Sequence, residues 1–443
     1  MKLFLLIITV CLIQADLQAT AMGDLAAGMK AGEWKQLVTQ NIATVLAEPG
    51  DGATGGVLGY AEKGAWDPQS EQFFFLGTDH MYSGLAQSSF VAYSAAANAW
   101  RALPKPYWVA GTTMHGYDHI AINPATSEIY YRSSNAKRAV WRYRRVQDVW
   151  QMASSMPTTF IATDDLIACC IGVVYFPELK GLVYADGDQG SIYSYGTTTA
   201  KWTMHATGLP MGPYHNFAEY NPVHKVVVCG GGNGSSDLYK VDSTGKVTTL
   251  KDAPLGLGIC QSIFTVDPVG GDYLVFGADG SFYVYDVLSD TWTRQPGNDF
   301  FSPVNGGGTS DGRLIWYVVA TPVSSYGVTI FVKFNFASSS VYLYKHSVPA
   351  ATEHSPSLAA GGLEITPNPV TDRAVIRAWN TGMEKTRPFQ MEAFDIRGVK
   401  VSTLSGDSEN RAIWNAGNLP AGIYVINIKT GSRTLSKKVL VSK

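Results

Sequence analysis

The sequence has 443 residues, of which 46% are hydrophobic and 16% charged, and its formal net charge is −2. This length is enough for two or three domains with large cores, and the near balance of charge argues against nucleic-acid binding, which usually needs a basic stripe. Tyr (23), Gly (45) and Trp (11) are abundant, whereas long stretches of helical period are scarce. The composition therefore favours an all-β protein.

The N-terminus predicts a signal peptide over residues 1–21. Lys2 precedes an apolar run from Leu3 to Ile13, and Ala19-Thr20-Ala21 follows as an A-x-A cleavage site. The apolar run is too short for a comfortable membrane span, and we find no other candidate transmembrane segment. The mature chain is therefore expected outside the cell or on its surface.

Residues 24–348 contain a repeat with a period of about fifty residues, as in propeller arrays. Four units end in "SAAANAW", "RVQDVW", "GTTTAKW" and "VLSDTW", whose final residues are Trp100, Trp150, Trp202 and Trp292. Upstream of each lie a short apolar strand with a Gly- or Asp-rich turn and an innermost strand that usually ends in Pro, as in "HGYDHIAINP" and "PYHNFAEYNP". Each unit thus predicts four antiparallel strands, which is one propeller blade.

Over roughly residues 55–345 these units resemble kelch and galactose-oxidase-like blades, which share the Gly-rich turn, the aromatic strand and the closing Trp. Five units are clear and a degenerate sixth ends in "VYLYKH", so we expect a six-bladed β-propeller, with room for a seventh blade around residues 24–60. Trp34-Lys35-Gln36-Leu37 echoes Trp100-Arg101-Ala102-Leu103. It predicts an outer strand that closes the ring with the last blade and so removes an open sheet edge.

After a predicted linker over residues 349–362, rich in Pro, Ala, Ser and Gly, residues 363–443 predict a small β-sandwich of short alternating strands. "PNP" at 367–369, "FDIRGVKV", "LPAGIYVINI" and the terminal "KKVLVSK" occur there in that order. The segment resembles the C-terminal (Por) sorting domain of type IX secretion in Bacteroidetes. The resemblance implies Sec export, contact of residues 363–443 with the secretion machinery, and release or attachment at the cell surface; the alternative is an ordinary accessory β-sandwich.

The innermost strands are expected to start at the mouth of a central channel. Aligned on their prolines, they bring Tyr117, Cys170, His215 and Gln261 to one level. Side chains two residues apart share one face of a strand, so His115, Tyr117 and His119 are expected to point the same way. The turns between second and third strands add polar groups around this mouth: Asp79, His80, Arg132, Asp186, Asp188, Asn233 and Asp279. A polar mouth over apolar strands predicts a binding cleft.

The first hypothesis for this cleft is binding of a polysaccharide or surface glycan. The residues expected to contact the ligand are His115, His80, Asp79, Asp186 and Gln261. Aromatics such as Tyr107, Trp108 and Trp141 are further candidates for stacking on sugar rings.

The second hypothesis is a uronate lyase. Such an enzyme needs a proton-transfer pair, for which His119 or His215 and Tyr117 or Tyr214 are candidates, and a cation against the carboxylate, for which Arg132 suits. Propeller lyases that act on ulvan are similar in architecture and in their use of His, Tyr and Arg.

The third hypothesis is a copper-radical oxidase. "PYHNFAEYNPVHKVVVCGGG" is similar to a galactose-oxidase stretch, which would make Tyr214 and His215 copper ligands. That site also needs a second His and a Tyr crosslinked to Cys, and no matching partner motif occurs, so we assign no metal site and leave the cofactor open.

Two features carry less specific expectations. In the basic run 136–145, charged residues alternate with apolar ones. This pattern is typical of the solvated face of an outer strand, and the alternative is a contact for an anionic polymer. Export permits disulfides, but the spacing of Cys169, Cys170, Cys229 and Cys260 leaves both buried thiols and one disulfide open.

Overall fold

The computed structural model divides the chain into two compact units, Met1–Pro349 and Ala350–Lys443. The residues described are 20–47, 57–78, 88–109, 115–133, 139–145, 147–157, 160, 170–259, 261–296, 318–334, 339–346, 362–366, 370–379, 390–395, 399–407, 411–430 and 433–442. Within these ranges no helix is both long and apolar enough to cross a membrane.

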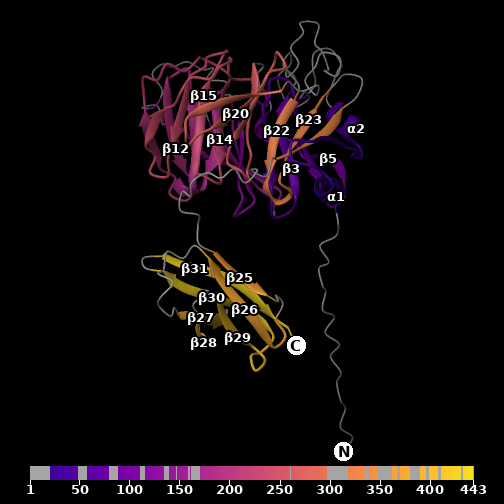
Figure 1. Cartoon of the computed structure of the whole chain (residues 1–443). Coiled ribbons are helices and arrows are strands. Elements are labelled where there is room, and N and C mark those ends of the chain that lie inside the picture. The colour runs from indigo at the N-terminus through magenta and orange to yellow at the C-terminus, as the bar shows by residue number, and fades with distance from the viewer. Residues whose placement is uncertain are drawn as a thin grey trace, which may run out of the picture. The chain divides into compact units, whose positions relative to one another are not determined.

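The described residues of the first unit form six four-stranded antiparallel sheets (Figure 1). Their innermost strands contact one another in a closed ring, in the order β2 (Ala65–Asp67), β6 (Ile120–Asn123), β10 (Gly172–Phe176), β14 (Asn216–Asn221), β18 (Ser262–Val266) and β22 (Val318–Val323). Sheets arranged radially around a ring of inner strands make a β-propeller, which confirms the predicted all-β class.

Each sheet continues outward through a second, a third and an outer strand. The second strands are β3 (Gln72–Thr78), β7 (Glu128–Arg132), β11 (Gly181–Asp186), β15 (Val226–Gly231), β19 (Tyr273–Gly277) and β23 (Val328–Lys333). The third strands are β4 (Ser88–Ser94), β8 (Ala139–Arg144), β12 (Ser191–Gly196), β16 (Leu238–Val241), β20 (Phe282–Asp286) and β24 (Ser340–Lys345). The outer strands are β5 (Ala99–Leu103), β9 (Val149–Ser155), β13 (Trp202–Ala206), β17 (Val247–Thr249), β21 (Thr291–Gln295) and β1 (Trp34–Leu37).

The repeated Trp of the sequence is one half of a cross-strand aromatic pair. Trp100 lies opposite Tyr93 on the third strand, with ring centroids 5.4 Å apart, and Trp292 lies opposite Tyr285 at 4.5 Å. The Tyr93 hydroxyl donates to Asn98, in the intervening turn, whose φ of 50° is left-handed. Such a pair stabilises the hairpin, and its turn residue favours Asn or Asp, which explains why aromatic strand, polar turn and Trp recur together.

The predicted closure of the ring is confirmed, because β1 pairs with β24 in antiparallel register from Trp34–Tyr344 to Leu37–Val341. Residues 21–47 otherwise form the short helices α1 (Ala21–Ala27) and α2 (Ile42–Ala47). Three short 3₁₀ helices complete the described elements of this unit, namely η1 (Tyr107–Val109), η3 (Pro177–Leu179) and η5 (Ser324–Tyr326).

Replacing Trp34 should loosen this closure. Its indole packs against Phe331 at 4.8 Å, Tyr344 at 4.9 Å and Phe276 at 5.6 Å between ring centroids. We expect Trp34→Ala to lower the free energy of unfolding by about 3 kcal/mol, measured by urea denaturation. Val38→Ala, at a neighbouring side chain that is 77% exposed, is the control; equal stability of the two variants would show that β1 does not lock the ring.

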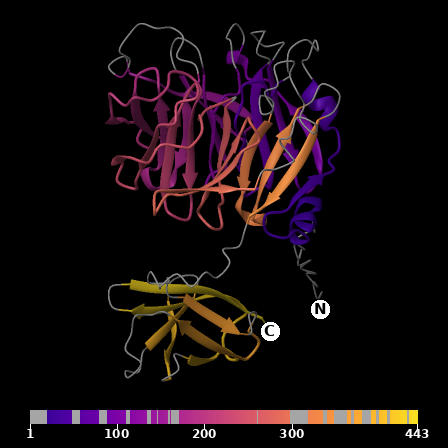
Figure 2. The ribbon, with the colours of Figure 1, turned by 45° about the horizontal axis from the view of Figure 1, so that its top comes forward.

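The second unit contains two antiparallel sheets (Figure 2). One has the order β25 (Gly362–Thr366), β26 (Arg373–Trp379), β29 (Arg411–Asn415), and the other β28 (Lys400–Ser405), β27 (Gln390–Asp395), β30 (Gly422–Thr430), β31 (Arg433–Val441). Its core contains Trp414, Ile376, Met391 and Ile426, and every member of that core belongs to this unit.

Candidate functional site

The heads of the innermost strands meet at one end of the ring, which we call the mouth. The segment 115–119 was predicted as the start of a strand, but β6 begins only at Ile120 and Tyr117 has a left-handed φ of 42°. Cys170, Tyr214 and His215 are also left-handed, at φ 75°, 65° and 63°. The segments that precede the inner strands are therefore turns. Their side chains come together because the backbone is left-handed there, and not because alternate residues of a strand share one face.

Four rings form a closed cluster at the mouth, which we call the ring quartet: Tyr60, His115, Tyr117 and His215. Going round it, the centroid distances are 5.5 Å from Tyr60 to His115, 5.0 Å to Tyr117, 6.2 Å to His215 and 5.7 Å back to Tyr60. Tyr117 also packs with Cys170 and Ile259. The structure thus brings together His115, Tyr117 and His215, and adds Tyr60, which the sequence analysis did not single out.

His119 and Arg132 lie beneath the quartet. The His119 ring is 5.0 Å from that of Tyr117, and its backbone carbonyl accepts the N–H of Arg132. His119 is 0% and Arg132 2% exposed, whereas Tyr214 at the rim is 43% exposed. Burial, followed by the nearby Arg132 guanidinium, holds the pKa of His119 well below its usual value. A polymer at the mouth can therefore touch Tyr214 but neither His119 nor Arg132.

The other predicted contacts are spread more widely. Asp186 is buried and turned into its own hairpin, where its carboxylate accepts from the Gln189 N–H and the Tyr193 hydroxyl. Gln261 lies beside Gly234 in the turn of the neighbouring sheet. Asp79 and His80 lie outside the described residues.

Most of the candidate stacking aromatics and the described arginines of the basic run pack on or pair within the sheet β6–β9. Trp108 and Trp141 stack on each other at 4.8 Å and are buried, so among the three candidates only Tyr107, 68% exposed, faces solvent. Arg142 and Arg144 pair with Glu128 at 3.6 and 3.7 Å. They belong to β8, which is the third strand of its sheet and not the predicted outer strand, because β9 pairs outside it.

The cysteine question is answered in part. Cys229 is a buried thiol in β15 without a disulfide partner among the described residues, and burial raises its pKa to about 12. Cys170 is buried at the mouth. Cys169 and Cys260 lie outside the described residues.

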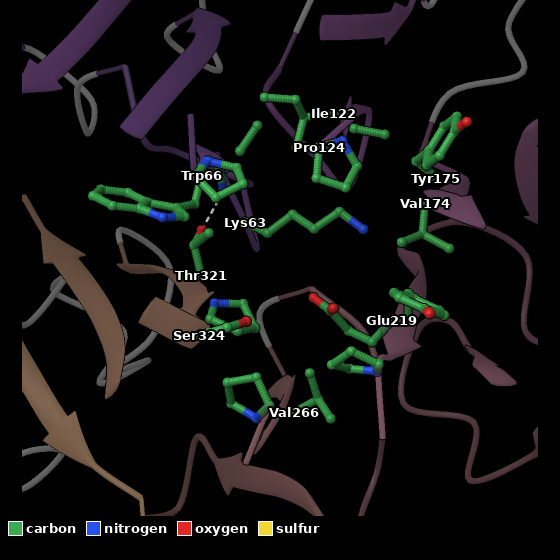
Figure 3. A pocket seen from close by; sticks show the side chains of 18 of the residues that line it. Lys63, Trp66, Ile122, Pro124, Val174, Tyr175, Glu219, Val266, Thr321 and Ser324 are labelled. Carbon is green, nitrogen blue, oxygen red and sulfur yellow. Dashed lines mark hydrogen bonds between the residues drawn. The ribbon is translucent and has the colours of Figure 1, made fainter. Parts of the chain in front are cut away.

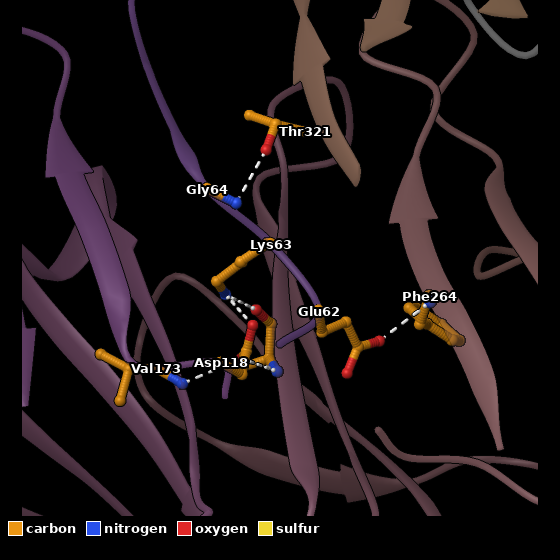
Figure 4. A network of polar contacts seen from close by, with 8 residues as sticks. Glu62, Lys63, Gly64, Asp118, Val173, Phe264 and Thr321 are labelled. Atoms are coloured by element: carbon orange, nitrogen blue, oxygen red, sulfur yellow. Dashed lines mark hydrogen bonds and ion pairs between the residues drawn. The ribbon is translucent and has the colours of Figure 1, made fainter. Parts of the chain in front are cut away.

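Below the mouth lie four buried ionisable groups that we call the charged plug: Glu62, Lys63, Asp118 and Glu219. Figure 4 shows the first three of them. The Lys63 ammonium lies 2.8 Å from Asp118 Oδ1 and donates to the Ala218 carbonyl at 2.6 Å. Asp118 Oδ2 accepts the N–H groups of Val173 and Ala218, at 3.1 and 2.8 Å. One ion pair thus ties the inner strands β10 and β14 to the segments that precede β2 and β6.

Glu62 extends the plug to the fifth sheet, because its Oε1 accepts the Phe264 N–H at 3.0 Å. Burial raises the pKa of Glu62 well above its usual value, and Asp118 raises it further. Burial also raises the pKa of Asp118, to about 6, against the opposing effect of Lys63. The carboxyls of the plug are thus much weaker acids than exposed ones.

The plug corrects one expectation, namely that the strands behind the mouth are apolar. Glu62 and Asp118 each stand six residues before the proline that follows their inner strand, and Lys63 and His119 stand five before it. In the alignment on the prolines, these residues therefore occupy the positions directly after the level of Tyr117 and His215. Within the ranges that the structure describes, no group of three or more His, Cys, Asp or Glu is placed to hold a metal ion.

The C-terminal unit decides the route of export. Residues 364–442 match the family described as the secretion system C-terminal sorting domain. This tail marks proteins of type IX secretion. The chain is thus secreted to the cell surface or the extracellular space, as the motifs of residues 363–443 predicted.

No curated protein matches the sequence closely enough to count as a relative. Among solved structures, a protein of unknown function from Bacteroides thetaiotaomicron is 11% identical with a TM-score of 0.44, covering 72% of this chain and 73% of that one. A chain of a nidogen/laminin complex is 12% identical with a TM-score of 0.39, and the match covers 53% of this chain and 79% of that one. PorZ, a surface component of the type IX secretion system of Porphyromonas gingivalis, is 11% identical with a TM-score of 0.36, and the match covers 88% of this chain and 60% of that one. The kelch and galactose-oxidase subtype is not among these matches, and no function is inferred from likenesses of this extent.

Proposed function

We propose that this exported propeller engages an extracellular glycan at its mouth. The observation that carries the proposal is the exposed Tyr214 beside the ring quartet, in which Tyr60 and His215 are partly exposed and pack on the buried His115 and Tyr117. Tyrosine offers an apolar face and a polar tip, and imidazole adds a donor and an acceptor. These groups match the C–H faces and hydroxyl rims of sugar rings.

The left-handed backbone supports a binding role for the pair Tyr214 and His215. Two consecutive non-glycine residues with φ near 65° cost conformational energy. Strain of this kind clusters at ligand sites, where the surrounding structure holds side chains in a set direction. Here it presents Tyr214 to solvent and keeps His215 against Tyr60 and Tyr117.

A uronate lyase is the second candidate, and the same adjacent Tyr and His favour it. They are the proton-transfer candidates nearest the rim, since His119 is fully buried. A lyase acting through them would also need a cation other than the buried Arg132 against the substrate carboxylate.

Removing the rim side chains should weaken glycan retention. We expect Tyr214→Ala and His215→Ala each to raise the dissociation constant at least tenfold, about 1.4 kcal/mol, in affinity electrophoresis on ulvan, alginate, glucuronan and neutral polymers. Tyr107→Ala removes a tyrosine that is more exposed than Tyr214, at 68% against 43%, and lies away from the quartet, so it should leave binding unchanged. A rise in absorbance from a new unsaturated bond, lost in His215→Ala, would establish the lyase instead. Failure of the folded wild type to bind any polymer would contradict both candidates.

A further inference from the structure

A second hollow lies at the end of the channel opposite the mouth, where the innermost strands finish. It is a cavity of about 230 Å³, lined by residues from all six inner strands or the turns that follow them (Figure 3). A proline from each sheet surrounds it: Pro68, Pro124, Pro177, Pro222, Pro268 and Pro322. Because proline fixes φ and donates no backbone hydrogen bond, this rim is stiff and weakly polar.

The wall of the cavity is aromatic and aliphatic. Trp66, Tyr175 and Tyr220 line it together with Ile122 and Val266 (Figure 3). A cavity of about 150 Å³ is enough to hold benzene, so this one has room for a single ring with a short arm. Indole and phenol faces also attract cations that come within about 6 Å of the ring centroid.

Two plug residues, Lys63 and Glu219, project into the cavity from its floor (Figure 3). The Lys63 ammonium is already paired with Asp118 and Ala218. Glu219 is 6% exposed, and its carboxyl has no hydrogen-bond or ion-pair partner among the described residues. A buried carboxyl without a partner is costly in its charged form. A ligand that pairs with Glu219 would therefore supply the missing partner.

The acidic and basic groups around the cavity decide which ligand fits. Three buried carboxyls, Glu62, Asp118 and Glu219, face one described ammonium, that of Lys63. An anionic ligand would find no free cation here, because Lys63 is already paired with Asp118 and the other groups are carboxyls, whether protonated or charged. A cation would meet the Glu219 carboxyl and the aromatic side chains of the lining.

We propose that this lower cavity binds a small organic ammonium ion, with a single-ring body against Trp66, Tyr175 and Tyr220 and its ammonium group on Glu219. This site is separate from the glycan mouth and does not depend on it.

The titration of Glu219 gives the proposal a second measurable property. Burial raises the pKa of Glu219 to about 8, Lys63 opposes the rise and Asp118 adds to it. The other groups that face it are Glu62 and, from β19, Tyr273, whose pKa it raises. Below pH 8 the free carboxyl holds a proton, and pairing with an ammonium ion must expel it. Affinity is therefore expected to rise about tenfold per pH unit up to pH 8, and to fall only when the amine itself deprotonates near pH 10.

The test uses three ligands of equal shape and different charge on the full chain: phenethylamine, phenethyl alcohol and phenylacetate. Isothermal titration at pH 7 should give binding of the amine at least tenfold tighter than of the alcohol, and none of the acid. Repeating the amine titration in buffers of different ionisation enthalpy should show close to one proton released per amine bound.

Glu219→Gln keeps the shape of the side chain, so it should abolish both the preference for the amine and the proton release, while Glu128→Gln, outside the cavity, should change neither. Equal binding of amine and alcohol by the wild type, or no binding of the amine at millimolar concentration, would overturn the proposal. Because these two outcomes are measured on the wild type, they decide the matter even if Glu219→Gln does not fold.

Discussion

Truncation after Pro349 is expected to abolish delivery of the propeller to the cell surface and the medium while leaving it folded. Residues 364–442 carry the secretion match, and the core of that unit contains only its own residues. Each described sheet likewise belongs to one unit alone. The propeller therefore loses its export signal and no part of its own core.

The measurement is immunodetection of residues 22–349 in the cell envelope and the medium of a bacterium with type IX secretion. We expect the full chain on the surface or in the medium and the truncated chain only inside the outer membrane. The melting temperature of the purified truncated chain should match the propeller transition of the full chain. Tyr107→Ala in the full chain is a control for substitution in the propeller. Truncated protein in the medium at normal yield would refute the sorting role.

The architecture was readable from the sequence because the determinants of a blade are local. Tyr93, Asn98 and Trp100 lie within eight residues and together specify one hairpin. The same arrangement recurs at Tyr143, Asp148 and Trp150. A local rule repeated at a fixed period needs no long-range information, and the echo of Trp100 at Trp34 even identified the strand that closes the ring.

The site was only partly readable, because its chemistry depends on depth along the channel. The spacing of the prolines placed Tyr117 and His215 at one level, and their rings do lie 6.2 Å apart. The left-handed φ of Tyr117 is unusual for a bulky residue, so Tyr117 itself did not point to a turn, although its neighbours Gly116 and Asp118 are common in turns. The full burial of His119 and Arg132 arises from packing between sheets, which a single sequence does not reveal.

The charged plug was missed for a related reason. Charged residues are seldom fully buried, so the predicted innermost strand "GYAEKGAWDP" gave no reason to single out Glu62 and Lys63 as buried partners. In a propeller the innermost strands face one another across a narrow channel, and a residue there is buried whatever its polarity. The partners are far apart in sequence, since Lys63 and Ala218 are separated by 155 positions.

Replacing Lys63 by methionine should destabilise the propeller strongly, and more so at high pH. Methionine fills a similar volume but leaves Asp118 buried without its cation. Breaking a buried ion pair from one side typically costs about 3–5 kcal/mol, and we expect a loss of this size at pH 8, measured by urea denaturation. Lys35→Met is the matched control, because that lysine lies on the outer strand β1 in an exposed pair with Glu33 and should matter little.

The pH dependence separates loss of charge pairing from loss of packing. In the wild type the pKa of Asp118 is already raised to about 6, against the effect of Lys63, so removing Lys63 must raise it further. A carboxyl whose pKa is higher in the folded than in the unfolded state stabilises the protein at low pH. This contribution is complete below the pKa of the unfolded state, and it is lost as pH rises through the pKa of the folded state. The cost of Lys63→Met should therefore be smaller at pH 5, where Asp118 is largely protonated in both proteins, and should grow toward pH 8. Adding Asp118→Asn, which removes the unpaired charge, should recover part of the loss at pH 8 but little at pH 5. A cost that is equal at both pH values, with no recovery in the double variant, would mean that Lys63 acts through packing alone and that the plug does not hold the inner strands by charge.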